Sequence, residues 1–135
     1  MKNKVGKTDQ ANELDLFLSS NYNELTKKYV TTFRLETSQI FTTFRYEIDV
    51  EETFHDNQIT FKLIGLKTPR LLIPGGGPAT FEKKYASLKG NYIVEIIGID
   101  KRKNVFEISI SKYKIKVIKT PEEKFINICI QNFLK

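Results

Sequence analysis

The sequence predicts a mostly β fold of the α+β class: a small antiparallel β-barrel or sandwich of five to seven strands, with an N-terminal helix and a C-terminal amphipathic helix. Two observations lead to this prediction. Apolar and polar residues alternate through much of residues 29–118, which is typical of half-buried strands. The two ends of the chain instead carry apolar residues three and four positions apart, the pattern of amphipathic helices.

The length of 135 residues fits one domain with its own core, so a single domain is expected over residues 1–135, with residues 1–8 as a disordered tail. The sequence has no apolar run of about 18 residues, so no membrane span is expected. Its basic start leads into no apolar stretch, so no secretory signal is expected. The single cysteine, Cys129, excludes an internal disulfide, and these features favour a reducing, cytoplasmic setting.

The two terminal helices are predicted over residues 9–20 and 120–135. The apolar stripe of the first consists of Ala11, Leu14, Phe17 and Leu18. The second begins with Thr120, Pro121 and Glu123, a capping box with proline at the first helical position. Its apolar face consists of two rows: Phe125, Cys129, Phe133 and Ile126, Ile130, Leu134. A face of this size must dock on the sheet or on a partner, so a homodimer or another protein bound through this helix is one hypothesis.

Two turns predict a three-stranded meander in the first half of the β core, residues 29–118. A turn at Thr37–Ser38 would pair Leu35 with Ile40. A turn at Asp56–Asn57 gives two further apolar pairs, Phe54 with Ile59 and Val50 with Leu63. On the other face it pairs the opposite charges of Glu51 and Lys62. Both registers place apolar residues on one face.

The second half of the β core predicts another hairpin. Residues 91–99 are apolar on both faces, as expected for a central strand covered on both sides, and would pair Ile97 with Ile108. The apolar phase then slips near Ser111–Lys112, which indicates a bulge or bend. The stretch Leu88-Lys89-Gly90-Asn91-Tyr92 resembles the L-x-G-x-Y corner of immunoglobulin-like sandwiches, which implies a Tyr92 hydroxyl bonded to the backbone.

The glycine-rich stretch between Ile73 and Lys84 is a candidate ligand or partner loop. Its candidate residues are Pro74, Gly75, Gly76, Gly77, Pro78, Lys83 and Lys84. Backbone N–H groups in such loops can hold a phosphate, but neither nucleotide-binding glycine spacing is present. A plain corner, in which glycine permits positive φ, is the competing interpretation.

Basic residues give a second candidate site, an anion or nucleic-acid surface. It consists of Lys101, Arg102, Lys103, Lys112, Lys114 and Lys116, in a chain of net charge +6. Lysine on an edge strand also prevents aggregation. The scarcity of arginine, the better phosphate ligand, indicates that codon usage of an A/T-rich genome can account for the charge.

Acidic residues form a third cluster, which includes Glu47, Asp49, Glu51 and Glu52 with His55 and Asp56. Three carboxylates on one strand face could hold a cation, but the solvated face of a sheet is normally polar and Lys62 is predicted opposite Glu51. No metal, no cofactor and no catalytic residue is therefore predicted.

The element order fits an OB-type barrel, a pleckstrin-homology-like barrel or a Greek-key sandwich, and fold analogy alone does not fix a function. The leading hypothesis is a non-catalytic binding or interaction module of unknown ligand. The alternative is an OB-like nucleic-acid binder that uses the lysine-rich strand face. A metal-dependent enzyme that uses the acidic cluster ranks third.

Overall fold

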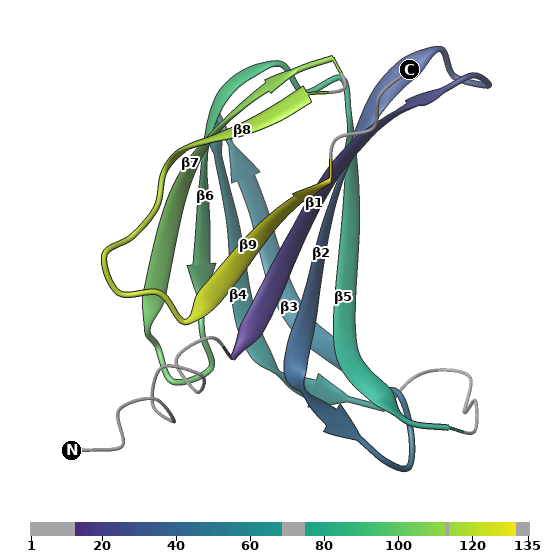
Figure 1. The fold of residues 1–135 in the computed structure, drawn as a ribbon, viewed down its shortest axis with the longest axis vertical. Helices are drawn as coiled ribbons and strands as arrows, with labels where there is room; N and C mark the ends of the chain where they lie inside the picture. The colour runs from purple at the N-terminus through teal and green to yellow at the C-terminus, as the bar shows by residue number, and fades with distance from the viewer. Residues whose placement is uncertain (1–12, 69–74, 113, 132–135) are drawn as a thin grey trace.

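The computed structural model describes residues 13–68, 75–112 and 114–131, and this part of the chain contains nine strands and no helix (Figure 1). The strands are β1 (Leu14–Asn23), β2 (Lys28–Phe41), β3 (Glu47–His55), β4 (Gln58–Lys67), β5 (Gly77–Ala86), β6 (Gly90–Ile97), β7 (Lys103–Ser111), β8 (Lys114–Lys119) and β9 (Ile126–Gln131). They form one sheet in the order β8-β7-β6-β4-β3-β5-β2-β1-β9, which curls into a nearly closed barrel. Within the described ranges there is no helix with the length and hydropathy needed to span a bilayer.

Side-chain hydrogen bonds hold the two edges of the sheet, β8 and β9, near each other. At one end, Ser20 Oγ donates to the Lys112 carbonyl across 2.6 Å. At the other end, the Asn104 side chain accepts hydrogen bonds from the backbone N–H groups of Phe125 (2.9 Å) and Ile126 (3.1 Å). Asn104 is only 1% exposed, so these bonds form where water does not compete.

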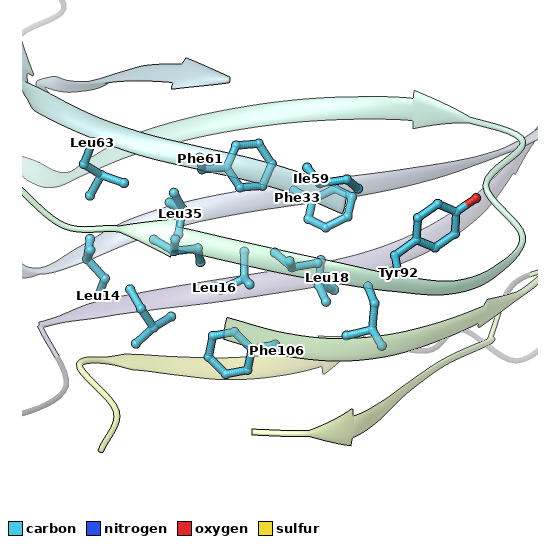
Figure 2. Packing of buried hydrophobic residues seen from close by; sticks show 14 of the residues in the cluster. Leu14, Leu16, Leu18, Phe33, Leu35, Ile59, Phe61, Leu63, Tyr92 and Phe106 are labelled. Atoms are coloured by element: carbon cyan, nitrogen blue, oxygen red, sulfur yellow. The ribbon is translucent and has the colours of Figure 1, made fainter. Parts of the chain in front are cut away.

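Alternate residues of the strands fill the barrel interior (Figure 2). Phe33 from β2 and Phe61 from β4 are fully buried, and their ring centroids lie 5.6 Å apart across the interior. Leu14, Leu16 and Leu18 of β1 project into the same core. Each fully buried side chain of this size contributes about 2 kcal/mol, which favours this closed arrangement over an open sheet.

The predicted N-terminal helix is wrong in its described part, because Leu14–Asn23 is a strand. Residues 9–12 lie outside the described ranges. Leu14 and Leu18 fit both a helical stripe and a strand face, and Leu16 completes the strand face. β1 forms ladders with β2 on one side and β9 on the other, so both edges of its backbone are paired. This pairing overrides the local helical spacing.

The predicted C-terminal helix is also wrong in its described part, because Ile126–Gln131 forms β9, parallel to β1. Ile126, Ile128 and Ile130 point toward the core, and β-branched isoleucine favours a strand over a helix. Residues 132–135 lie outside the described ranges. Phe125 and Ile126 are buried within this chain. The hypothesis of a dimer through a C-terminal helix therefore loses its basis, because the described part of that segment is not helical.

The predicted meander is half confirmed. β3 and β4 form the expected hairpin, and its three pairs are as predicted: Phe54 with Ile59, Val50 with Leu63, and Glu51 with Lys62. β2 does not turn back onto β3 at Thr37–Ser38. Instead β5 lies between β2 and β3, and Leu35 pairs with Phe81.

The second predicted hairpin, β6 with β7, is present in a different register. Val94 pairs with Phe106, and Ile97 pairs with Lys103 instead of Ile108. β6 lies inside the sheet as predicted, but Ile93 and Ile97 on its outer face are only half-buried. The phase slip near Ser111–Lys112 is the turn from β7 into β8, where Lys112 has a φ of 53°.

The hydrogen bond expected at the Tyr92 corner is confirmed. The Tyr92 hydroxyl accepts from the Lys89 backbone N–H (3.1 Å) and donates to the Lys89 carbonyl (3.2 Å). Gly90, between them, has a φ of 105°, a conformation that favours glycine. The corner therefore forms here in a single curled sheet.

Candidate functional site

A cavity of about 820 Å³ opens at one end of the barrel, the lower end in Figure 1. We call it the mouth cavity. Its apolar lining consists of Leu14, Phe41, Ile48, Leu63, Leu66, Gly98, Ile99 and Phe125. Its polar lining consists of Glu13, Thr37, Ser38, Gln39, Asp100 and Arg102. The mostly apolar wall with a few polar groups is typical of small-molecule sites.

A β-bulge in β4 shapes one wall of the mouth cavity. Val50 pairs with Leu63, whereas Asp49 pairs with Gly65, so β4 carries one extra residue, Ile64. Beyond the bulge, Leu66 pairs with the buried Ile48 and lines the cavity with Leu63. The bulge therefore turns two leucines toward the same space.

A second irregularity, in β2, shapes the facing wall. The β2–β5 register shifts between Glu36 and Ile40, and Thr37 replaces the lost ladder bonds. Its hydroxyl accepts a hydrogen bond from the Ala79 backbone N–H (2.9 Å) and donates one to the Gln39 carbonyl (2.8 Å). Residues 37–39 thus leave the ladder with β5 and line the cavity.

Arg102 joins three parts of the mouth cavity. Its Nη2 lies 2.7 Å from Glu13 Oε1, and its Nε lies 2.6 Å from Asp100 Oδ2. Its guanidinium carbon lies 4.7 Å from the centre of the Phe125 ring, a cation–π geometry. The Arg102 backbone N–H, and then its side chain, hydrogen-bond to Asp100 and hold the pKa of that carboxyl below its usual value.

The glycines of the predicted ligand loop pack tightly against the chain. A Cβ on Gly76 would lie 1.9 Å from the Phe41 carbonyl oxygen, so only glycine fits there. Arg45 Nε donates to the Gly76 carbonyl across 3.2 Å. Gly75 has a φ of 102°, Pro78 pairs with Ile40 in β5, and Pro74 lies outside the described ranges. These contacts support the corner interpretation.

Lys83 and Lys84 lie far from these glycines, because they follow Gly77 by six and seven residues along β5, about 20 Å away. Lys83 points inward, 3.5 Å from Glu52 and over the Tyr85 ring. Lys84 points to the opposite face and pairs with Glu82 across 3.6 Å.

The six predicted anion-binding residues lie in two groups rather than on one surface. Lys101 and Arg102 lie in the β6–β7 turn. Lys103 begins β7 and pairs with Glu95 across 3.1 Å. The other three residues lie at the far end of β7 and on β8, about 26 Å away along the strand: Lys112, Lys114 and Lys116. Of all six, the structure brings Arg102 into the mouth cavity.

Three carboxylates of the acidic cluster lie beside lysines of β4. Lys67 Nζ lies 4.0 Å from Glu47 and 3.9 Å from Asp49, and Glu51 pairs with Lys62 in the ladder. Glu52 instead points into the barrel, where it accepts a hydrogen bond from the Tyr85 hydroxyl. Among the residues that the structure describes, no group of three His, Cys, Asp or Glu side chains is arranged to hold a metal ion.

Cys129 lies half-buried in β9, opposite Phe17. Burial, and then the nearby charge of Asp15, raises the pKa of its thiol, which disfavours the nucleophilic thiolate. Cys129, predicted on the apolar face of a C-terminal helix, instead lies on the face of β9 opposite the core-facing Ile128 and Ile130.

The residues that sequence reasoning missed are the walls of the mouth cavity, above all Leu66, Ile99 and Asp100. One signal was present: Gly65 inside an apolar strand pattern indicates a bulge. The other walls come from segments far apart in the sequence, so no local pattern joins them.

Comparison with family models, with curated proteins and with solved structures found no match for this chain. A proposal for its function therefore depends on the mouth cavity and on the charges around it.

Proposed function

We propose that this protein is a non-catalytic binding module that takes a small ligand with an apolar body into the mouth cavity. The observation that carries this proposal is the cavity itself, about 820 Å³ with a mostly apolar lining. Sites for small molecules usually have volumes of about 300–1,000 Å³ and the same mixture of apolar walls and few polar groups.

The exposure of apolar side chains in the lining supports a ligand at this position. Leu14, Ile48 and Phe125 are buried, with exposed fractions of 6%, 2% and 2%, and form the inner lining. Leu66 and Ile99 are 44% and 57% exposed, although both line the cavity. A ligand that covers such side chains gains about 25 cal/mol for each Å² of apolar surface removed from water, before the cost of ordering.

The polar lining supports binding rather than catalysis, because most of its groups already make hydrogen bonds or ion pairs within the chain. The Thr37 hydroxyl makes two hydrogen bonds to the backbone. The carboxylates of Glu13 and Asp100 both bind Arg102. Groups held in this way fix the shape of the site.

A matched pair of tryptophan variants tests the proposal. Leu66→Trp fills the mouth cavity, whereas Ile64→Trp adds the same ring two residues away, at a position 50% exposed that does not line the cavity. The probe is N-phenyl-1-naphthylamine, an uncharged fluorescent compound, titrated into wild-type and variant protein. We expect saturable binding that Leu66→Trp weakens about tenfold or more, equal to about 1.4 kcal/mol, and that Ile64→Trp leaves unchanged. Equal binding by both variants would refute the proposal.

The second candidate function is nucleic-acid binding through β8. Lys114 and Lys116 are exposed on the same face of this edge strand, which supports an electrostatic surface. The OB-type analogy lacks its helix in the described ranges, so the lysines alone support this candidate. Two results would favour this candidate: binding of single-stranded DNA that weakens steeply with salt, and a loss of that binding in the double variant Lys114→Gln, Lys116→Gln.

The cytoplasmic setting expected from the lone cysteine stays a prediction.

A further inference from the structure

We propose that the ligand of the mouth cavity is a cationic amphiphile, with an apolar body inside the cavity and a positively charged head at Glu13 and Asp100. This inference rests on the proposed function and adds the chemical class of the ligand. The charges of the lining residues and the contacts of Arg102 support it.

The charges that line the mouth cavity leave one net negative charge. Glu13 and Asp100 supply two carboxylates, and Arg102 supplies one guanidinium. Arg102 lies within 2.7 Å of both carboxylates, so its charge is already compensated. A cationic head therefore meets an attractive field, whereas an anionic head would approach a guanidinium flanked by two acids.

The geometry leaves acceptor capacity for a cationic head. The ion pair with Arg102 engages Oε1 of Glu13, and each carboxylate oxygen can accept more than one hydrogen bond. The Arg102 guanidinium lies over the Phe125 ring, against the wall of the cavity. An ammonium group can thus join Glu13 and Asp100 without displacing Arg102.

The charge of the whole chain does not reverse this preference. The net charge is +6, but charges separated by more than about 10 Å of solvent are largely screened at 0.1 M salt. Lys101 and Lys124 lie near the site in sequence, and both are exposed and do not line the cavity. Lys103, also nearby, is paired with Glu95.

Three probes that share one decyl chain test the inference: decylamine, decanol and decanoate, each below its micelle concentration at neutral pH. Calorimetric titration of the full chain at about 0.1 M salt, where distant charges are screened, should give the tightest binding for decylamine and the weakest for decanoate. We expect about fivefold between successive probes, because a unit charge at about 4 Å in water changes the free energy by about 1 kcal/mol. Added salt should reduce these differences.

Charge-changing variants sharpen the test. Arg102→Gln should raise the affinity for decylamine and lower that for decanoate, and Asp100→Asn should do the opposite. Glu51→Gln removes an exposed acid outside the cavity and should change neither affinity.

The outcomes separate this inference from the proposed function. Binding of decanol that Leu66→Trp abolishes, together with decanoate binding more tightly than decylamine, would overturn the cationic head and leave the cavity site standing. Failure of all three probes to bind in a way that depends on Leu66 would overturn the proposed function itself.

Discussion

The two ends of the barrel differ in how their interiors are filled. At the mouth end the cavity remains between the strands. At the other end, which we call the aromatic end, four rings pack together: Phe33, Phe54, Tyr85 and Tyr92. Phe54 contacts Tyr85 and Tyr92, with centroids 5.2 and 6.2 Å apart, and Phe33 contacts Tyr85 at 5.6 Å. Figure 2 shows Tyr92 and Phe33 at this side of the core and Leu14 and Leu63 at the opposite side.

The courses of β2 and β4 explain part of this difference. Near the aromatic end, β2 pairs with β5 without interruption from Val30 to Glu36. Near the mouth end, both β2 and β4 depart from the regular ladder. Bulges bend strands and spread a barrel end, so space opens that leucine side chains do not fill. The shifts in β2 and β4, rather than a special residue type, therefore shape the candidate site.

The largest expected effect comes from breaking the aromatic end. Phe33→Ala removes a fully buried ring that packs on Phe61 and Tyr85, and should lower the free energy of unfolding by about 3–5 kcal/mol. Phe41→Ala at the mouth end removes a half-buried ring and should cost only about 1–2 kcal/mol. Urea unfolding of both variants measures the two losses in free energy of unfolding. Equal losses would show that the two ends are equally packed.

Removing the Asn104 side chain at the mouth end should have an intermediate effect on the free energy of unfolding. Asn104→Ala leaves the N–H groups of Phe125 and Ile126 and the Glu123 carbonyl without this partner, a loss of about 2–3 kcal/mol. Because Phe125 lines the mouth cavity, binding of the naphthylamine probe should weaken as well. Asn57→Ala, which removes one exposed bond to the Asn91 carbonyl, is the matched control and should cost about 0.5 kcal/mol. A stable Asn104→Ala variant with unchanged probe binding would contradict this role.

The smallest expected effect concerns Tyr85, where β3 and β5 separate. These strands share one ladder pair, Glu47 with Thr80, and beyond it Glu52 contacts both Lys83 and the Tyr85 hydroxyl. Inward-pointing charges beside open edges discourage wrong strand pairing. Tyr85→Phe should lower the free energy of unfolding by about 1 kcal/mol at neutral pH.

Tyr85 should also make stability depend on alkaline pH. Burial, and then the hydrogen bond and charge of Glu52, raises the pKa of the Tyr85 hydroxyl in the folded protein. An unfolded tyrosine ionises near pH 10, so the stability from Tyr85 is present below about pH 10 and is lost as the pH rises toward the raised pKa. Urea unfolding at about pH 9 and about pH 11 should show a smaller decrease for Tyr85→Phe than for wild type. Tyr22→Phe, at an exposed ring, should behave as wild type; an identical decrease in all three would contradict the assignment.

Several parts of the fold could be predicted because their signals are local. The β3–β4 hairpin, with Asp56 at a φ of 55°, follows from a turn flanked by alternating residues. The Tyr92 corner follows from five consecutive residues. The compact packing of Gly76 against Phe41 agrees with the corner interpretation of the glycine-rich stretch.

The candidate site could not be predicted in the same way. Arg102 was singled out as a basic residue, but its partners Glu13 and Asp100 come from the start of the described chain and from its own turn. The role of Leu66 depends on a bulge that only the pairing with β3 defines. Neither relation leaves a periodic pattern in the sequence.

By itself, the sequence determined which residues prefer the interior of a sheet and where the local turns fall, because side chains on a strand alternate with a period of two. Only the tertiary structure decided that Leu14–Asn23 and Ile126–Gln131 are adjacent parallel strands, that β5 separates β2 from β3, and that a cavity remains at one end. The physical reason is that backbone hydrogen bonds between strands join residues more than a hundred positions apart. The leucines of residues 14–18 fit both the helical and the strand spacing. The segment forms a strand because distant strands complete its hydrogen bonds.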